Sequence, residues 1–351
     1  MSSYPEASDL YEKFRHCSDE AWLQILVASL KLPEIEGVRM PAFPDPSFQS
    51  EVHGHSGEVS LHEAFMFFRE IKAYCRYAGR PLSAETRLLD FGCGWGRILR
   101  IFMKDIRPEH LFGIDSTSRF LMEARRCNPA LGFLQTGLAP PTMITAGSFD
   151  LIVSFSVFSH LDEFIAGLWI NEFHRLLRPG GLAVITTQSR RFIAFCAEQR
   201  LRRASGIRLE HGWYEACADS FTDEARANAR YDAGRFLHAT PVRRPHPGAH
   251  YGEAIIPRDI SSRNGGICSE LSNFWMIRPV CLRCLWSCRR WNDETYTTRW
   301  CCVRHDPLCG SGKSLGPVAP RGAGGDDRGY RAGSGDSFEA LSTTGARVQT
   351  L

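Results

Sequence analysis

A glycine-rich turn between an apolar strand and an apolar helix constrains this chain more than any other feature. The segment reads Leu88-Leu89-Asp90-Phe91-Gly92-Cys93-Gly94-Trp95-Gly96-Arg97-Ile98-Leu99. Glycine tolerates left-handed backbone conformations and has no Cβ, so such a turn bends sharply and lets a ligand approach the backbone. The glycines follow the spacing Gly-x-Gly-x-Gly, and Arg97 stands where a dinucleotide fingerprint would place its third glycine. The turn predicts a ligand at the carboxyl end of this strand.

Three further segments follow in a fixed order. Leu111 to Asp115 is a short apolar strand whose terminal acid lies roughly 20 residues after the turn, the spacing at which a carboxylate meets ribose hydroxyls. Ser116-Thr117-Ser118 then offers helix caps. Phe149 to Leu161 contains a second apolar strand, and Leu176 to Thr186 carries Pro-Gly-Gly, where a helix is expected to stop before a buried strand.

Together, over about residues 85 to 190, these four segments resemble the motifs of class I S-adenosylmethionine (SAM)-dependent methyltransferases. The resemblance implies an α/β, Rossmann-like, doubly wound fold with a mostly parallel sheet and flanking helices. It also implies SAM as methyl donor and a methyltransferase activity. Strands are expected at 87–91, 111–115, 131–134, 149–154 and 181–187.

The resemblance also implies which residues contact SAM. Asp90 would orient the methionine ammonium group, the glycine loop would let the backbone approach, and Asp115 would bind the ribose. The segment after the third strand would edge the adenine, and Phe155 would pack on the cofactor, on the substrate or, equally, in the core. The expected cofactor residues are Asp90, Gly92, Cys93, Gly94, Trp95, Gly96, Asp115, Ser116, Gly137, Leu138 and Phe155.

His160 is the candidate catalytic residue. It follows the fourth predicted strand, at the carboxyl edge where such sheets bind ligands, and an imidazole suits proton removal near neutral pH. Alternatively, His160 hydrogen-bonds a neighbouring loop or caps the helix that begins near Asp162. An acceptor that is a carboxylate or an already reactive amine would need no base.

Composition excludes several classes of protein. The chain has 351 residues, 43% of them hydrophobic, and a net charge of +3, which by itself indicates neither nucleic acid nor an anionic membrane as partner. No apolar run is long enough to span a bilayer, and the first residues lack the pattern of a signal peptide, so a cytoplasmic location is expected. The expected acceptor is a small molecule, a sugar or a lipid-linked group, and no metal is expected.

The chain divides by composition into three parts. Residues 1–58 read as an N-terminal helical and irregular segment, and residues 59–257 as the methyltransferase domain. Residues 258–351 differ in character, because seven of the 13 cysteines and four of the eight tryptophans fall there, followed by a stretch rich in Gly, Ser, Arg and Asp. Such a stretch cannot build a core, which predicts a disordered tail.

Two functional interpretations of this tail are weak. Cys281-x-x-Cys284 with Cys302, His305 or Cys309 has a loose zinc-ligand spacing, whereas a zinc ribbon would show two clean Cys-x-x-Cys pairs. Gly310-Ser311-Gly312-Lys313-Ser314 is not a phosphate-binding loop, because Pro307 stands where its first glycine is needed.

We hypothesise that the tail is translated out of frame from near Asp259. Joining each codon's last base to the next codon's first two converts Phe274-Trp275-Met276-Ile277 into Leu-Asp-Asp, whichever synonymous codons are used. Permissive codons convert Val280 to Cys288 into a stretch such as Leu-Pro-Gln-Val-Leu-Val-Val-Leu. A strand, an acidic turn and a second strand result, like the antiparallel pair that usually completes the family's sheet. The chain as written is therefore expected to lack that pair.

Other functional classes remain open at this point. The chain could bind SAM without catalysing methyl transfer. An oxidoreductase on a similar sheet is disfavoured by the glycine spacing and by the Leu-Arg-Pro-Gly-Gly turn. A zinc-linked nucleic-acid module in the tail would depend on the single Cys-x-x-Cys pair.

Overall fold

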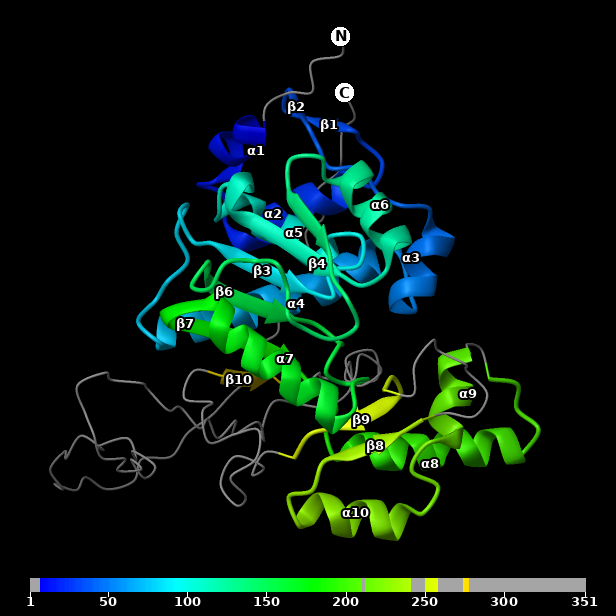
Figure 1. Ribbon diagram of the computed structural model, residues 1–351. Helices are drawn as coiled ribbons and strands as arrows, with labels where there is room; N and C mark the ends of the chain where they lie inside the picture. The colour runs from blue at the N-terminus through cyan, green and yellow to red at the C-terminus, as the bar shows by residue number, and fades with distance from the viewer. Residues whose placement is uncertain (1–6, 210–211, 241–249, 258–273, 278–351) are drawn as a thin grey trace, which may run out of the picture. The chain divides into compact units, whose positions relative to one another are not determined.

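The computed structural model describes residues 7–209, 212–240, 250–257 and 274–277 (Figure 1). Its helices are α1 (Ala7–Phe14), α2 (Asp19–Ala28), α3 (Pro46–His53), α4 (Gly57–Tyr77), α5 (Arg97–Ile101), α6 (Ser118–Cys127), α7 (Glu163–Leu176), α8 (Arg191–Ala204), α9 (Gly212–Asp219) and α10 (Glu224–Asp232), with short 3₁₀ turns at Phe102–Lys104 and Pro108–His110. Its strands are β1 (Glu34–Ile35), β2 (Val38–Arg39), β3 (Leu88–Phe91), β4 (Leu111–Asp115), β5 (Gly132–Gln135), β6 (Phe149–Ser154), β7 (Leu177–Thr186), β8 (Leu237–Ala239), β9 (Glu253–Ile255) and β10 (Phe274–Ile277).

The main sheet has the strand order β10-β7-β6-β3-β4-β5, and every pair in it is parallel. The chain winds outward from β3 through β4 to β5, returns to β6 beside β3, and continues to β7. This is the doubly wound α/β arrangement that the sequence predicts. All five expected strands are present, so the predicted fold class is confirmed.

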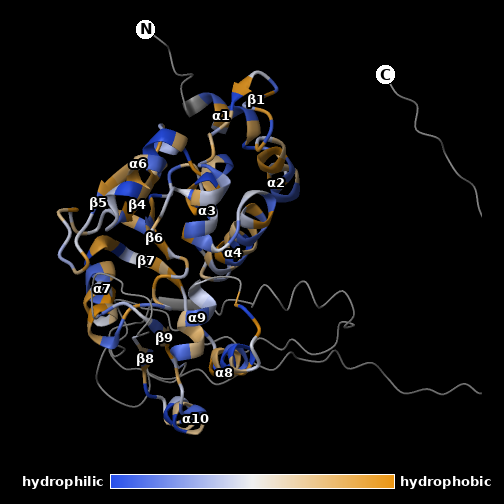
Figure 2. Ribbon diagram, turned by 90° about the vertical axis from the view of Figure 1, so that its right-hand side faces the viewer, coloured by the Kyte–Doolittle hydropathy of each residue, from blue (hydrophilic) through white to orange (hydrophobic). Residues whose placement is uncertain are grey.

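Alternate residues of the strands face opposite sides of the sheet, as the two-residue period of a strand requires. Leu88, Val153 and Val184 belong to the core beneath α2, α4 and α5, whereas Leu89 and Ile152 belong to the core beneath α7. Helices α4 and α7 consequently lie on opposite faces of the sheet (Figure 2).

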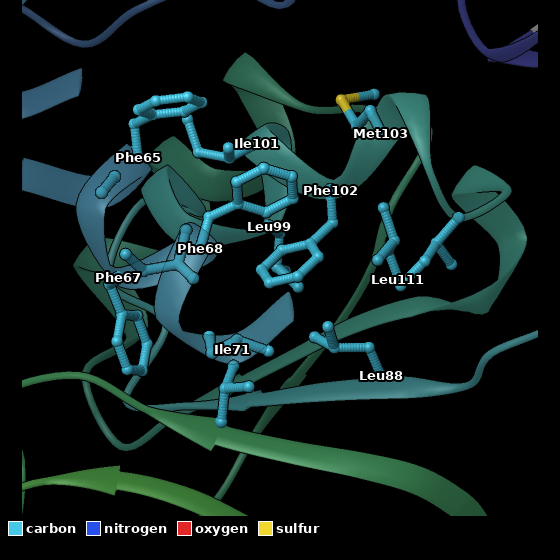
Figure 3. Packing of buried hydrophobic residues seen from close by; sticks show 14 of the residues in the cluster. Phe65, Phe67, Phe68, Ile71, Leu88, Leu99, Ile101, Phe102, Met103 and Leu111 are labelled. Carbon is cyan, nitrogen blue, oxygen red and sulfur yellow. The ribbon is translucent and has the colours of Figure 1, made fainter. Parts of the chain in front are cut away.

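The core beneath α4 is largely aromatic and aliphatic (Figure 3). Phe68 of α4 meets Phe102 edge to face, with ring centroids 5.0 Å apart. The N-terminal segment joins this core, because Trp22 of α2 is fully buried and donates its Nε1 hydrogen to the carbonyl oxygen of Ile101 over 2.8 Å. Residues 1–58 thus contribute packing to the sheet, and the domain boundary at 58/59 remains a prediction.

The segment after β7 builds a smaller layer around its own apolar cluster. Helices α8, α9 and α10 pack with the antiparallel pair β8 and β9, around Phe192, Cys196, Cys217 and Leu237. We call this segment, residues 188–257, the cap. Its strand β9 is anchored to the main sheet, since Ile256 donates its backbone N–H to Thr187 Oγ1 over 3.3 Å.

Beyond the cap, the structure describes β10 alone. This strand pairs in parallel with β7 from Ala183 to Thr186. The antiparallel pair that usually completes the family's sheet is not among the described residues, and its absence from the chain stays a prediction. The remainder of the predicted tail, including the candidate zinc ligands, lies outside the described residues.

Candidate active site

Asp90 lies at the point where the strand order reverses. It is in register with Gly113 of β4 on one side and with Val153 of β6 on the other. The chain leaves β3 toward one edge of the sheet and returns at β6, so the carboxyl end of β3 is the switch point at which open α/β sheets bind ligands, and we call this place the crevice. Asp90, the end of β4 and the loop after β6 converge there.

The loop after β3 requires glycine for two reasons. Gly92 has φ +72°, and a Cβ on it would lie 2.3 Å from Cγ2 of Val157 in the loop after β6. Gly94 has φ +53°, and its missing Cβ would lie 3.4 Å from Val52 and 3.7 Å from His53 of α3. The backbone therefore turns through left-handed conformations in a crevice that side chains would fill.

Asp115, at the end of β4, holds this loop. Its Oδ2 accepts the backbone N–H of Gly94 over 3.0 Å, and its Oδ1 accepts that of Thr117 over 2.8 Å. Burial raises the pKa of Asp115, while the N–H groups of Thr117 and Gly94 favour its charged form. Ser116 next to it is exposed.

Two of the predicted cofactor residues, Cys93 and Trp95, have buried side chains. The Cys93 side chain lies against β4, because a Cβ on Gly113 would be 2.7 Å from its Sγ. The Trp95 indole is fully buried beside Phe43 and the guanidinium of Arg100, which lies 4.5 Å from its ring centre. The Trp95 ring also lies beside His53, with centroids 6.0 Å apart, and among the described residues its Nε1 has no hydrogen-bond partner.

Asp90 is a buried acid at this switch point of the sheet. It is 1% exposed, and among the described residues its Oδ2 has no hydrogen-bond partner. Burial raises its pKa to about 8; nearby Arg97 acts in the opposite direction, and Asp115 adds to the rise. A buried carboxyl group without a partner is costly, which points to a cationic partner supplied by a ligand.

His53 is a candidate site residue that the sequence interpretation did not include. Helix α3 begins at the capping residue Asp45 and ends at Gly54, which has φ +81°, so His53 is its last residue. Within the described chain the buried His53 Nε2 has no hydrogen-bond partner, and it would lie 3.9 Å from a Cβ on Gly94. Burial, together with Arg97 and His55, holds the pKa of His53 well below its usual range, so the ring is neutral. Only the folded chain brings this histidine, 41 residues upstream of Gly94, to the loop.

The remaining predicted contacts differ in their surroundings. Gly137 and Leu138 follow β5 and are exposed, and the Leu138 carbonyl oxygen accepts the Nε1 hydrogen of Trp169 over 3.0 Å. Phe155 packs against Phe67 of α4 at 5.0 Å and lies under the Arg97 guanidinium at 5.2 Å. Phe155 thus contributes to the wall between the crevice and the core.

His160 is fixed between the loop after β6 and the cap. Its Nδ1 lies 2.8 Å from the carbonyl oxygen of Gly252, and its ring stacks on Tyr251 with centroids 4.9 Å apart. Sequence analysis left open that His160 caps the helix that begins near Asp162. Asp162 itself supplies that helix cap, because its Oδ1 accepts the N–H of Ile165. The other alternative, a hydrogen bond from His160 to a neighbouring loop, is present at Gly252, and it orients the His160 ring.

Comparisons with known proteins agree with this geometry. A family model described as a methyltransferase domain matches residues 62–228. Residues 62–228 form a class I SAM-dependent methyltransferase domain. The match covers the glycine loop, Asp115 and His160, together with helices α8 and α9 of the cap.

Curated relatives match over parts of their length. The chain is 33% identical over 107 residues to the malonyl-[acyl-carrier protein] O-methyltransferase of Enterobacter lignolyticus, covering 30% of this chain and 41% of that protein. It is 24% identical over 168 residues to the trans-aconitate 2-methyltransferase of Paracidovorax citrulli, covering 47% and 61%. The chain thus spans less than two thirds of the length of either relative.

Among solved structures, SAM-bound CalS10, an amino pentose methyltransferase from Micromonospora echinaspora, is 22% identical. The match covers 41% of this chain and 56% of that one, with a TM-score of 0.32. An overlap this loose carries no argument about the site.

The residues at the crevice match the chemical groups of SAM. The methionine end of SAM carries an ammonium and a carboxylate, and the crevice offers Asp90 Oδ2 as an acceptor and the neutral His53 ring for the opposite charge. The glycine loop provides the close backbone approach between them. Among the described residues, no group of histidines, cysteines or acids could hold a metal ion.

In the part of the chain that the structure describes, no helix combines the length and the apolar character that a membrane span needs.

Proposed function

We propose that this chain transfers a methyl group from SAM to a small-molecule, sugar or lipid-linked acceptor. The observation that carries the proposal is Asp90: a buried carboxyl group whose Oδ2 lacks a protein partner, at the switch point of the sheet and beside a left-handed glycine loop. A cationic amino group is the partner that this carboxyl group lacks.

The remaining contacts follow from position. His53 Nε2 is the proposed partner of the methionine carboxylate, and Asp115 the proposed partner of the ribose hydroxyls. The two Asp115 oxygens already accept the backbone N–H groups of Gly94 and Thr117, so a ribose hydroxyl would share these acceptors. Gly137 and Leu138, exposed after β5, would line the adenine.

The chemistry is a displacement at carbon. SAM, when bound, supplies a methyl group on a sulfonium, which is a good leaving group. The acceptor heteroatom gives its proton to His160 Nε2 and bonds to the methyl carbon, while the old sulfur–carbon electron pair stays on sulfur. The crevice contributes mainly by holding the reactants in line and excluding water.

The acceptor is proposed only by class. The two curated relatives named above differ in the acceptors that their names print, and their matches cover 30% and 47% of this chain. The cap supplies the acceptor side, with Trp213 and Tyr251 near His160, and nothing in it favours a nucleic acid. A cytoplasmic location likewise remains a prediction.

The deciding experiment is a calorimetric titration of SAM into the full chain, with NAD as control. We expect micromolar binding of SAM and none of NAD. Asp90→Asn should abolish SAM binding, whereas Asp150→Asn, on an acid at the opposite end of the sheet, should not. Absence of SAM binding by a folded chain would refute the proposal.

A second pair of variants tests the loop itself. Gly94→Ala places a methyl group in the crevice, whereas Gly147→Ala imposes the same backbone strain at φ +66° with nothing within 4 Å. Only Gly94→Ala should weaken SAM binding. SAM binding without methyl transfer to any member of an acceptor panel would favour the alternative, a SAM-binding protein without catalysis.

A further inference from the structure

Three consecutive residues of the cap surround the His160 ring. Tyr251 stacks on it, the carbonyl oxygen of Gly252 lies 2.8 Å from Nδ1, and Oε1 of Glu253 lies 3.7 Å from the same nitrogen. A carbonyl oxygen only accepts hydrogen bonds, so Nδ1 carries the proton in the neutral ring, and the lone pair is on Nε2.

The backbone fixes this arrangement. Gly252 donates its N–H to the carbonyl oxygen of His160, and Ala254 donates to that of Ser159, both over 2.7 Å. These two hydrogen bonds pair the start of β9 with the loop after β6. The position of Glu253 relative to His160 is therefore set by the main chain and does not depend on a flexible side-chain contact.

Glu253 is itself held by the cap. Its side chain is 3% exposed, and Oε1 accepts the Nε1 hydrogen of Trp213 over 3.0 Å. The Trp213 ring stacks on Phe195 at 5.6 Å and on Phe192 at 6.1 Å. Burying a carboxyl group costs free energy. The position of Glu253 beside the His160 imidazole, with Trp213 as its hydrogen-bond donor, therefore points to a functional role.

We propose that Glu253, held by Trp213, is a positioning residue for His160. The Gly252 carbonyl oxygen holds the imidazole in the Nδ1–H form, and the Glu253 carboxylate, 3.7 Å from Nδ1, stabilises the imidazolium that forms when Nε2 takes the acceptor's proton. The inference rests on the proposed function, since it assigns His160 the role of base. It also narrows the acceptor to a group that must lose a proton, a hydroxyl or an amine, because a carboxylate needs no base and would approach a buried carboxyl group.

Other titratable groups lie near the ring and have to be separated from Glu253. They are His238 on β8, Asp162 at the start of α7, and His250, which pairs with Asp162. Asp162 is the matched control, because Asp162→Asn removes a nearby negative charge while it leaves the Glu253–His160 pair intact.

The test is a ¹⁵N-histidine NMR titration of the full chain without SAM, with the His160 resonances assigned by their loss in His160→Gln. Glu253→Gln keeps an oxygen for Trp213 and removes only the charge. We expect the midpoint of the His160 titration to fall by about one pH unit, a tenfold change in proton affinity. Trp213→Phe, which keeps the ring stack, should give a smaller fall, and Asp162→Asn less than either.

A His160 midpoint that stays within a few tenths of a pH unit in both Glu253→Gln and Trp213→Phe would overturn the inference. A shift as large in Asp162→Asn would also overturn it, because the effect would then be general charge and not positioning. The titration needs neither SAM nor an acceptor. A chain that fails to bind SAM would therefore refute the proposed function and leave this result to be judged separately.

Discussion

Gly94 donates its backbone N–H to Oδ2 of Asp115 over 3.0 Å, which ties the loop after β3 to the end of β4 in the protein alone. The acid expected to bind ribose is therefore also a structural part of the loop expected to hold the methionine end. Substitutions at Asp115 should consequently affect both the stability of the fold and the affinity for SAM.

Asp115→Ala tests this double role. It leaves the N–H groups of Gly94 and Thr117 without their acceptor, which should cost about 1–3 kcal/mol of unfolding free energy, and SAM affinity should fall at least roughly tenfold. Asp150→Ala is the control, because Asp150 likewise accepts a backbone N–H, that of Arg87, at the other end of the sheet. Urea unfolding and calorimetry should show a stability loss in both variants and an affinity loss only in Asp115→Ala.

Asp90 predicts that SAM binding releases a proton. Burial raises its pKa to about 8, so the folded, SAM-free protein holds a proton on Asp90 at pH 7, and the ammonium of SAM would favour the ionised form. The binding enthalpy at pH 7 should therefore vary with the ionisation enthalpy of the buffer by roughly one proton per SAM. Equal enthalpies in phosphate and Tris would contradict the assignment.

The raised pKa of Asp90 also determines how the free energy of unfolding changes with pH. The folded-state pKa of Asp90 lies above its unfolded value of 3.8, so between pH 4 and pH 8 the folded protein binds more protons than the unfolded chain. The contribution of Asp90 to stability therefore falls as pH rises through this window. Asp90→Asn should remove that part of the pH dependence in urea unfolding between pH 5 and pH 8.

Sequence reasoning predicted what depends on local pattern. Strands β4 and β6 have the expected bounds because each is a mostly apolar run that ends in a polar residue, with Asp150 as the one acid inside β6. Strand β7 begins at Leu177, four residues before its expected start, because Leu177 pairs with Phe149 ahead of an irregularity in the ladder. Thr117 occupies the cap position of α6 without a side-chain cap bond, and its backbone N–H donates to the Asp115 carboxylate.

The parts of the site that sequence reasoning missed depend on long-range packing. His53, Trp213 and Glu253 carry no motif, and each is positioned by a contact between residues 40 to 93 apart in the sequence: His53 with the loop at 94, Trp213 with 253, and Glu253 with 160. The strands β8 and β9 are only three residues long, too short for a periodic signal. Cys93 and Trp95 were placed by the motif alone, which specifies the backbone path but not the direction of the side chains.

Gly92 and Val157 form a pair suited to a double-mutant cycle. Gly92→Ala would place its Cβ 2.3 Å from Val157 Cγ2, and Val157→Ala removes that methyl group and leaves Cβ at 3.6 Å. We expect the double variant to recover about 1–2 kcal/mol of the stability lost in Gly92→Ala. The left-handed backbone at φ +72° keeps recovery incomplete. Strictly additive effects on unfolding free energy would show that the two positions do not meet.

The lowered pKa of Glu172 predicts that the protein loses stability at acidic pH. Its carboxylate accepts hydrogen bonds from Arg175 and from the N–H and hydroxyl of Thr142, and these contacts, Arg175 first, lower its pKa to about 2. A lowered folded-state pKa stabilises the protein above the unfolded value of 4.5, and the contribution is lost as pH falls from 4.5 toward 2. Glu172→Gln should be less stable than the parent at pH 7, by about 2 kcal/mol, and the gap should shrink at pH 3.5. A gap that does not change with pH would show that packing, not charge, is responsible.

The proposed frameshift near Asp259 can be tested at the sheet edge. In the chain as written, β10 pairs in parallel with β7 from Ala183 to Thr186, and the shifted frame replaces Phe274 to Ile277 by Leu-Asp-Asp between two apolar strands. A frame-restored chain would bury more apolar surface against β7, so each additional kcal/mol should raise the melting temperature by about 2–4 °C. Sequencing the gene across this junction should reveal a single-base insertion or deletion. An unambiguous in-frame sequence shared by closely related strains, together with no gain in melting temperature on frame restoration, would reject the hypothesis.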